Sequence, residues 1–273
     1  MHLIHPSLTA GLEGALAMEL TMSTLHARER LLTWLALITV SILAWGYLIM
    51  HGMHAQMPMN GEMTSTSDDM SVLVTATVMW SVMMVAMMLP SASPMLLTFL
   101  RIHQQREREA GASTATWVFM AGYLAVWLAF AGAAAVMQWA LQQSALLSSS
   151  LGHVTPLLGG ALLVTAGAFQ FSDLKQACLN KCRSPLSFLM TEWREGNGGA
   201  LIMGLRHGAY CTGCCWALML LMFVGGVMSL VWMAGLALYF LAEKLLPQAE
   251  RISQISGFLL AGVGVIILLS AAY

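Results

Sequence analysis

Three cysteines within one apolar stretch have the spacing of ligands to a soft metal ion. Cys211, Cys214 and Cys215 stand at positions i, i+3 and i+4, so on a helix their thiols share one face. Met219 and Met222 continue that face. Thiol and thioether sulfur atoms are the ligands that Cu(I) prefers. The pattern therefore predicts a soft-metal site, and the alternative is that small buried cysteines pack helices together.

A nitrogen donor and two more thiols precede this segment. His207 lies four residues before Cys211, on the same helical face. Cys178 and Cys182 are also four residues apart, in the polar stretch that leads into the apolar one. Their spacing is not that of a zinc ribbon, which needs two Cys-x-x-Cys pairs at a fixed separation. We therefore count His207, Cys178 and Cys182 among the candidate metal ligands.

A second sulfur-rich segment lies in an earlier apolar run. Met79, Met83 and Met87 form one row at i, i+4 spacing, and Met84 and Met88 form another row beside it. Such rows would let a soft ion move from one thioether to the next. The alternative is a stripe of methionines that packs the bundle or faces lipid, since methionine is acceptable in both places.

A proline follows these methionines. Pro90 has no backbone N–H, so it is predicted to kink or end the regular helix. The carbonyl groups that it frees need other donors. Ser91 and Ser93 are close enough in sequence to supply them.

The segment before this run is rich in methionine and histidine. Residues 50–63 include five methionines, two histidines and no lysine, arginine or cysteine. Thioether and imidazole ligands suit copper better than Mg²⁺ or Ca²⁺. An interfacial loop that binds no metal is the alternative. The residues that we expect to capture metal here are Met50, His51, Met53, His54, Met57 and Met59.

The composition predicts a membrane protein. Of 273 residues, 58% are hydrophobic and only 9% are charged, which is too few charges for the surface of a soluble domain of this size. A net charge of -1 gives nucleic-acid binding no electrostatic support. We predict an all-α, polytopic helical bundle in a lipid bilayer. Its seven spans would be residues 31–50, 72–99, 115–138, 155–172, 203–224, 227–243 and 253–270.

The basic residues predict the orientation of this bundle. With seven spans, all twelve Lys and Arg residues fall on one side, which the positive-inside rule makes cytoplasmic. The N-terminus is then inside and the C-terminus outside, as expected for a protein of the bacterial inner membrane. Residues 1–30 form a cytoplasmic tail and residues 31–273 one transmembrane domain, with an outer loop at 50–70. The cysteines then lie toward the reducing side, where thiols persist.

Few residues suggest catalysis or energy coupling. The sequence has no P-loop and no arrangement of Ser, His and Asp or of paired carboxylates that we would assign to catalysis, so we predict that the chain is not an enzyme. Asp173 with Lys175, and Glu243 with Lys244, stand at the inner ends of two predicted spans. We expect these charges to lie at the membrane interface, where a charge costs little.

Several longer motifs have counterparts in a known family. They include Met83–Met95, Phe169–Pro185, Gly208–Met219, Gly225–Met228 and the pair Glu243–Lys244. At these residues the chain resembles the bacterial family of predicted metal-binding integral membrane proteins, catalogued as a domain of unknown function. The resemblance covers most of the chain after residue 30. It implies a helical membrane protein that binds metal and is associated with copper handling.

Two functions fit these observations. In the first, the chain binds Cu(I) and relays or transports it between the Met/His segment, the methionine rows and the thiols. In the second, it is an assembly factor, a metallochaperone that metallates a partner membrane metalloenzyme without transport. A periplasmic metallochaperone is a further candidate partner. A redox protein with a bound cofactor, and a scaffold in which sulfur only packs, also stay open.

Overall fold

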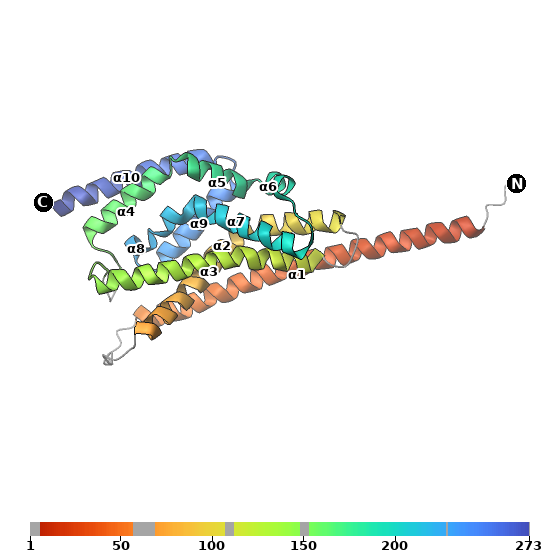
Figure 1. Ribbon diagram of the computed structural model, residues 1–273, viewed down its shortest axis with the longest axis horizontal. Helices are drawn as coiled ribbons and strands as arrows, with labels where there is room; N and C mark the ends of the chain where they lie inside the picture. Colours follow the sequence, from red (N-terminus) through yellow and green to blue (C-terminus); the bar gives the residue numbers. More distant parts are fainter. Residues whose placement is uncertain (1–5, 57–68, 107–111, 148–152, 228, 273) are drawn as a thin grey trace.

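The computed structural model describes residues 6–56, 69–106, 112–147, 153–227 and 229–272 (Figure 1). This part of the chain is helical, as predicted. The helices are α1 (Pro6–Gln56), α2 (Asp69–Arg106), α3 (Ala112–Gln143), α4 (Pro156–Phe169), α5 (Asp173–Arg183), α6 (Pro185–Glu192), α7 (Gly196–Met219), α8 (Met222–Gly225), α9 (Leu230–Leu245) and α10 (Ala249–Ala272).

Several of these helices could cross a membrane. Within the described residues, five are long and apolar enough, in α1, α2, α3, α7 with α8, and α10. The pair α4 and α5 is bent by 66° and makes a sixth span only if both helices are counted together. Helix α9 has 16 residues and is about 24 Å long, less than the roughly 30 Å of a hydrocarbon core. A multi-pass membrane protein is therefore supported, while the count of seven spans and the orientation stay predictions.

The first helix is longer than the first predicted span. Helix α1 begins at Pro6 and continues to Gln56, so residues 6–30 are helical and continuous with the apolar part that follows. Residues 50–56, which we predicted to open the outer loop, are its last turns. The described chain resumes at Asp69, where α2 begins.

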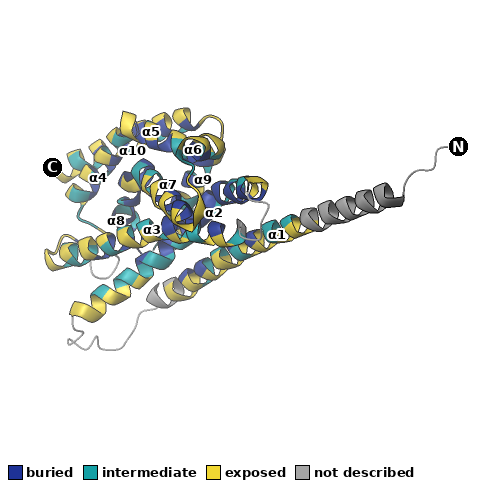
Figure 2. Cartoon of the chain, turned by 45° about the vertical axis from the view of Figure 1, so that its right-hand side comes forward, coloured by how far each residue is buried: buried dark blue, intermediate teal, exposed yellow. Residues whose placement is uncertain are grey.

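Helix α7 lies at the centre of the bundle. In the most apolar 18 residues of α7 with α8, 56% are buried, against 17% in α10. Figure 2 colours each described residue by how far it is buried. Helix α3 packs closely against it, because a methyl group added to Gly204 of α7 would collide with the Phe119 carbonyl of α3. Small residues allow such close approach between helices in a membrane. The close contact holds α7, with its cysteines, firmly against α3.

Pro90 does not end its helix. Helix α2 runs through Pro90 and Pro94 to Arg106. In a regular helix the N–H of residue 90 would donate to the carbonyl of Ala86, and here the indole N–H of Trp45 in α1 donates to that carbonyl at 3.1 Å. The helix therefore continues because a neighbouring helix supplies the missing donor.

The two serines do not satisfy the carbonyl that Pro90 frees, so that prediction is wrong; Trp45 donates to it. The Ser93 hydroxyl donates to the Pro90 carbonyl at 2.8 Å, which the missing N–H of Pro94 would otherwise leave without a donor. The Ser91 hydroxyl donates to the Met88 carbonyl at 2.9 Å. Both bonds lie at the Pro90 end of the methionine rows.

Trp45→Phe is expected to destabilise the protein by about 1–3 kcal/mol, because the buried Ala86 carbonyl would lose its donor. In a Pro90→Ala background the same change should cost much less, since Ala at position 90 restores the backbone donor. Denaturant unfolding in detergent, followed through the four proteins of this double-mutant cycle, measures the difference. Equal costs in both backgrounds would contradict this account of the Trp45 hydrogen bond.

Candidate metal site

Twelve sulfur-bearing side chains from five helices meet in one buried core. These twelve are each 8% exposed or less. This arrangement excludes a lipid-facing stripe for the buried methionines of α2. The members are Met83, Met84, Met87 and Met88 of α2, Cys178 and Cys182 of α5, Cys211, Cys214, Cys215 and Met219 of α7, Met222 of α8 and Met233 of α9.

The methionine face of α2 and the cysteine face of α7 border the same buried core. The rings of Trp80 in α2 and Phe223 in α8 lie 5.4 Å apart. The Tyr123 hydroxyl of α3 donates to the Met88 carbonyl at 3.4 Å and lies 3.3 Å from the Cys211 sulfur. A side chain of α3 therefore joins α2 and α7 at the level of Cys211.

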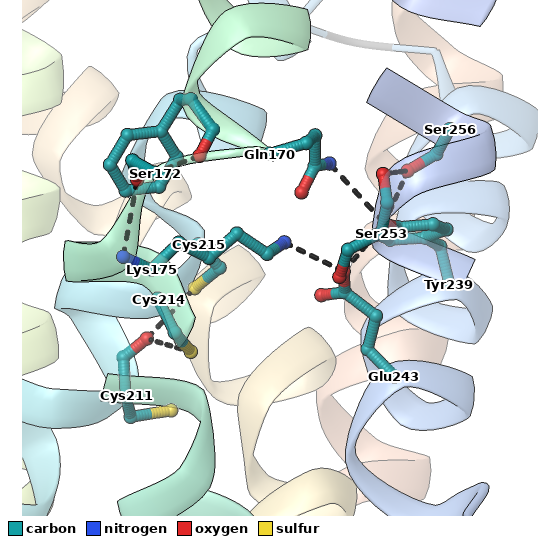
Figure 3. A network of polar contacts seen from close by, with 11 residues as sticks. Gln170, Ser172, Lys175, Cys211, Cys214, Cys215, Tyr239, Glu243, Ser253 and Ser256 are labelled. Atoms are coloured by element: carbon teal, nitrogen blue, oxygen red, sulfur yellow. Dashed lines mark hydrogen bonds and ion pairs between the residues drawn. The ribbon is translucent and has the colours of Figure 1, made fainter. Parts of the chain in front are cut away.

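The thiols of α5 and α7 form one group. The Cys214 and Cys215 thiols each donate to the Cys211 carbonyl at 3.0 Å (Figure 3). The Cys182 thiol of α5 lies in the same buried core, close enough to Cys211 and Cys214 to interact with both. Cys178 lies at the edge of the group, with its sulfur 2.9 Å from the place that a Cβ on Gly213 would occupy. Helix α5 thus brings Cys182 onto the cysteine face of α7.

The thiols do not form a finished coordination shell in this arrangement. Within the described residues, no group of three or more His, Cys, Asp or Glu side chains is placed so that it could hold a metal ion. Two of the thiols are turned toward a backbone carbonyl, and they would have to rotate to bind an ion. The cysteine ligand set predicted from the sequence therefore stays a prediction.

His207 lies one turn before Cys211 and is buried. Its ring stacks on Tyr123 at 5.5 Å and meets the edge of Phe188 at 5.5 Å. Its Nδ1 atom has no hydrogen-bond partner among the described residues. A buried ring nitrogen without a partner is compatible with a ligand role, although aromatic packing alone also explains its position.

The candidate ligands of the outer segment are only partly placed. Met50 and His51 are exposed at the end of α1, where the His51 ring stacks on Tyr47. Met53 and His54 belong to the last turns of α1, but their side chains lie outside the described residues, as do Met57 and Met59 altogether. Metal capture by these six residues stays a prediction.

Met79 lies apart from the buried methionines. It is half-buried and lines a cavity of about 320 Å³ between α2 and α3, together with Gln138 and Gln142. It could therefore accept an ion from solution before the buried rows do.

The predicted interface charges include a buried ion pair, and that part of the prediction is wrong. Lys175 of α5 and Glu243 of α9 are 0% and 1% exposed, and their charged atoms lie 2.6 Å apart. The same Glu243 oxygen accepts hydrogen bonds from Tyr239 and Ser253, each at 2.6 Å (Figure 3). Only Asp173 is exposed, as expected. The pair fastens α5 to α9, because a buried charge needs a compensating partner.

Lys244 is buried as well, and it touches the cysteine group. Its ammonium lies 3.0 Å from the Cys211 sulfur, 2.9 Å from the Ser91 hydroxyl and 4.0 Å from the Met88 sulfur. It thus stands between the inner end of the methionine rows and the cysteines. We had placed Lys244 at the interface, but it belongs to the site.

One pattern in the sequence could have predicted that Lys175 is buried. Lys175, Cys178 and Cys182 are spaced by three and four residues, so they share one face of α5. A face that carries two buried thiols also buries the lysine.

The comparisons with known proteins support a role in copper handling. No curated protein and no solved structure matches the chain. One family model matches it, over the region that contains the methionine rows, the cysteine group and both buried lysines. Because it matches residues 77–267, well over half of the sequence, the chain belongs to the copper chaperone family PpoB2.

Proposed function

We propose that the chain is a membrane copper chaperone that holds Cu(I) at its buried thiols and passes it to a partner metalloenzyme. Membership of a copper chaperone family supports copper as the cargo. The residues that we assign to binding are Cys182, Cys211 and Cys214, with Cys215 and Met88 beside them.

The observation that carries this proposal is the meeting of three thiols from two helices in a buried core. Cys182 lies close enough to Cys211 and Cys214 to interact with both, and all three are 8% exposed or less. Unpaired thiolates are costly in such a place, whereas a cation that replaces the thiol protons offsets the cost. Thiolate sulfur also favours Cu(I) over harder ions.

Transfer of the ion needs only an exchange of ligands. Each sulfur atom that joins the coordination shell lets another leave, so the ion is never free. The thioethers of Met84 and Met88 have no proton to lose, and they can accept the ion without a change of protonation. Cys178 lies at the edge of the group, so it is suited to releasing the ion to a partner.

Transport across the bilayer is the second candidate. The observation that favours it is the depth covered by the buried sulfur atoms, from Met222 next to Phe223 down to Cys211. The half-buried Met79, which lines the cavity between α2 and α3, would give the ion an entrance. In this case the methionine rows would conduct the ion and not only receive it.

Two measurements on the full-length protein test these functions. Metal analysis after gel filtration in detergent should find bound copper, and X-ray absorption should find Cu(I) with sulfur ligands. In liposomes with a Cu(I)-sensitive dye inside, a chaperone leaves the internal copper unchanged, whereas a transporter raises it. A purified protein that binds no Cu(I) would rule out both the chaperone and the transporter.

A further inference from the structure

We propose that Lys244 makes the site selective for a monovalent soft cation held by two thiolates. The inference rests on the proposed function, and it concerns the charge of the ion and not its softness. Of the three thiols assigned to binding, two bind as thiolates and the third stays protonated. In this account Lys244 is a specificity-determining residue that acts through the positive charge of its ammonium.

The surroundings of Lys244 leave its charge without a carboxylate partner. Its side chain is 9% exposed, and its contacts are Cys211, Ser91 and Met88. Among the described residues, the ion pairs join Lys175 to Glu243 and Arg206 to Glu192, and neither includes Lys244. The neighbouring Glu243 is thus already engaged. The groups near Lys244 that can become anionic are the cysteines.

Charge balance then favours one kind of complex. Two thiolates and a monovalent ion form a complex with one negative charge, which the Lys244 ammonium neutralises. Two thiolates and a divalent ion form a neutral complex, which leaves the ammonium uncompensated in a buried place. A net buried charge is costly, so the ammonium stabilises the first complex and not the second.

The size of the effect follows from the distance between the charges. At about 5 Å and an effective dielectric constant of about 20, two unit charges interact strongly enough to change an affinity about a hundredfold. An ammonium 3.0 Å from the Cys211 sulfur is near enough for an effect of this size.

Two soft ions of different charge separate this role from a structural one. Ag(I) and Hg(II) both bind two thiolates in a linear arrangement, so they need the same ligands and differ in charge. Both affinities are measured on the detergent-solubilised full chain by competition with a small thiol. For Lys244→Gln we expect the Ag(I) affinity to fall about a hundredfold relative to the Hg(II) affinity. Lys244→Arg should keep the wild-type ratio.

A second variant tests the same charge effect while keeping the lysine. Ser91→Asp places a carboxylate beside the ammonium, so it should also lower the Ag(I) affinity relative to the Hg(II) affinity. Ser91→Asn is its uncharged control and should keep the wild-type ratio.

The ratio of the Ag(I) affinity to the Hg(II) affinity tests the selectivity role of Lys244. If both ions weaken together in Lys244→Gln, or if neither Lys244→Gln nor Ser91→Asp changes the ratio, the selectivity role is wrong. In those cases the wild type still binds Ag(I), so the proposed copper function survives. A wild type that binds neither ion would instead overturn the proposed function itself.

Discussion

Replacing Cys211 and Cys214 together by serine is expected to lower the affinity for Cu(I) by at least about a thousandfold, because two soft donors are lost from one site. The Cys182 thiol lies close to both of them, so it would be left without a second thiol of this group to share the ion. Competition with a chromophoric Cu(I) chelator on the detergent-solubilised protein measures the change. Serine is small enough to keep the helix packing intact.

Cys178→Ser is the matched control for this loss. It removes a thiol from the same core, but one at the edge of the cysteine group beside Gly213. We expect the copper stoichiometry of this variant to equal that of the wild type. If the double variant keeps its Cu(I) affinity while its unfolding curve is unchanged, the ion is bound elsewhere and these two thiols only pack the helices.

The second large effect concerns the stability of the bundle. Lys175→Met and Glu243→Gln should each destabilise the protein by about 3–5 kcal/mol, because each leaves the partner charge buried and uncompensated. Denaturant unfolding in detergent, followed by tryptophan fluorescence, measures the loss. Either single variant should also bind copper more weakly, since the pair fastens the helix that bears Cys182.

The double variant and a surface pair complete this test. Lys175→Met with Glu243→Leu removes both charges, and it should cost clearly less than either single change. Glu192→Gln breaks the more exposed pair with Arg206 and should cost at most about 1 kcal/mol. A Lys175→Met variant as stable as Glu192→Gln would show that the buried pair does not hold α5 in place.

The sequence was sufficient to predict which sulfur-bearing residues share a helical face. The i, i+4 rows of α2 and the cysteine spacing of α7 predicted two sulfur-bearing faces, and both faces are buried in the same core. This success has a simple cause, since helical periodicity fixes which side chains share a face. The same rule also placed Cys178 and Cys182 on one face of α5.

The buried charges could not be predicted in this way. We judged Lys175, Glu243 and Lys244 from their place near the ends of apolar runs, which is where charges in membrane proteins usually meet water. Their burial depends on which helices pack against them, and helical periodicity does not specify which helices are neighbours. The bend of 66° between α4 and α5 was likewise unpredicted, although it is what turns α5 onto α7.

The shortness of α9 has a consequence for how a donor reaches the thiols. A helix of 16 residues is roughly 6 Å shorter than a bilayer core, so lipid must thin around its end or the end must stay below the headgroups. Lys244 lies in its last turn, next to Cys211. Where the lipid thins, the adjoining solution comes close to the cysteines without any pore. A small thiol that carries copper could then exchange its ion with the site directly, at a rate set by the thickness of the surrounding membrane.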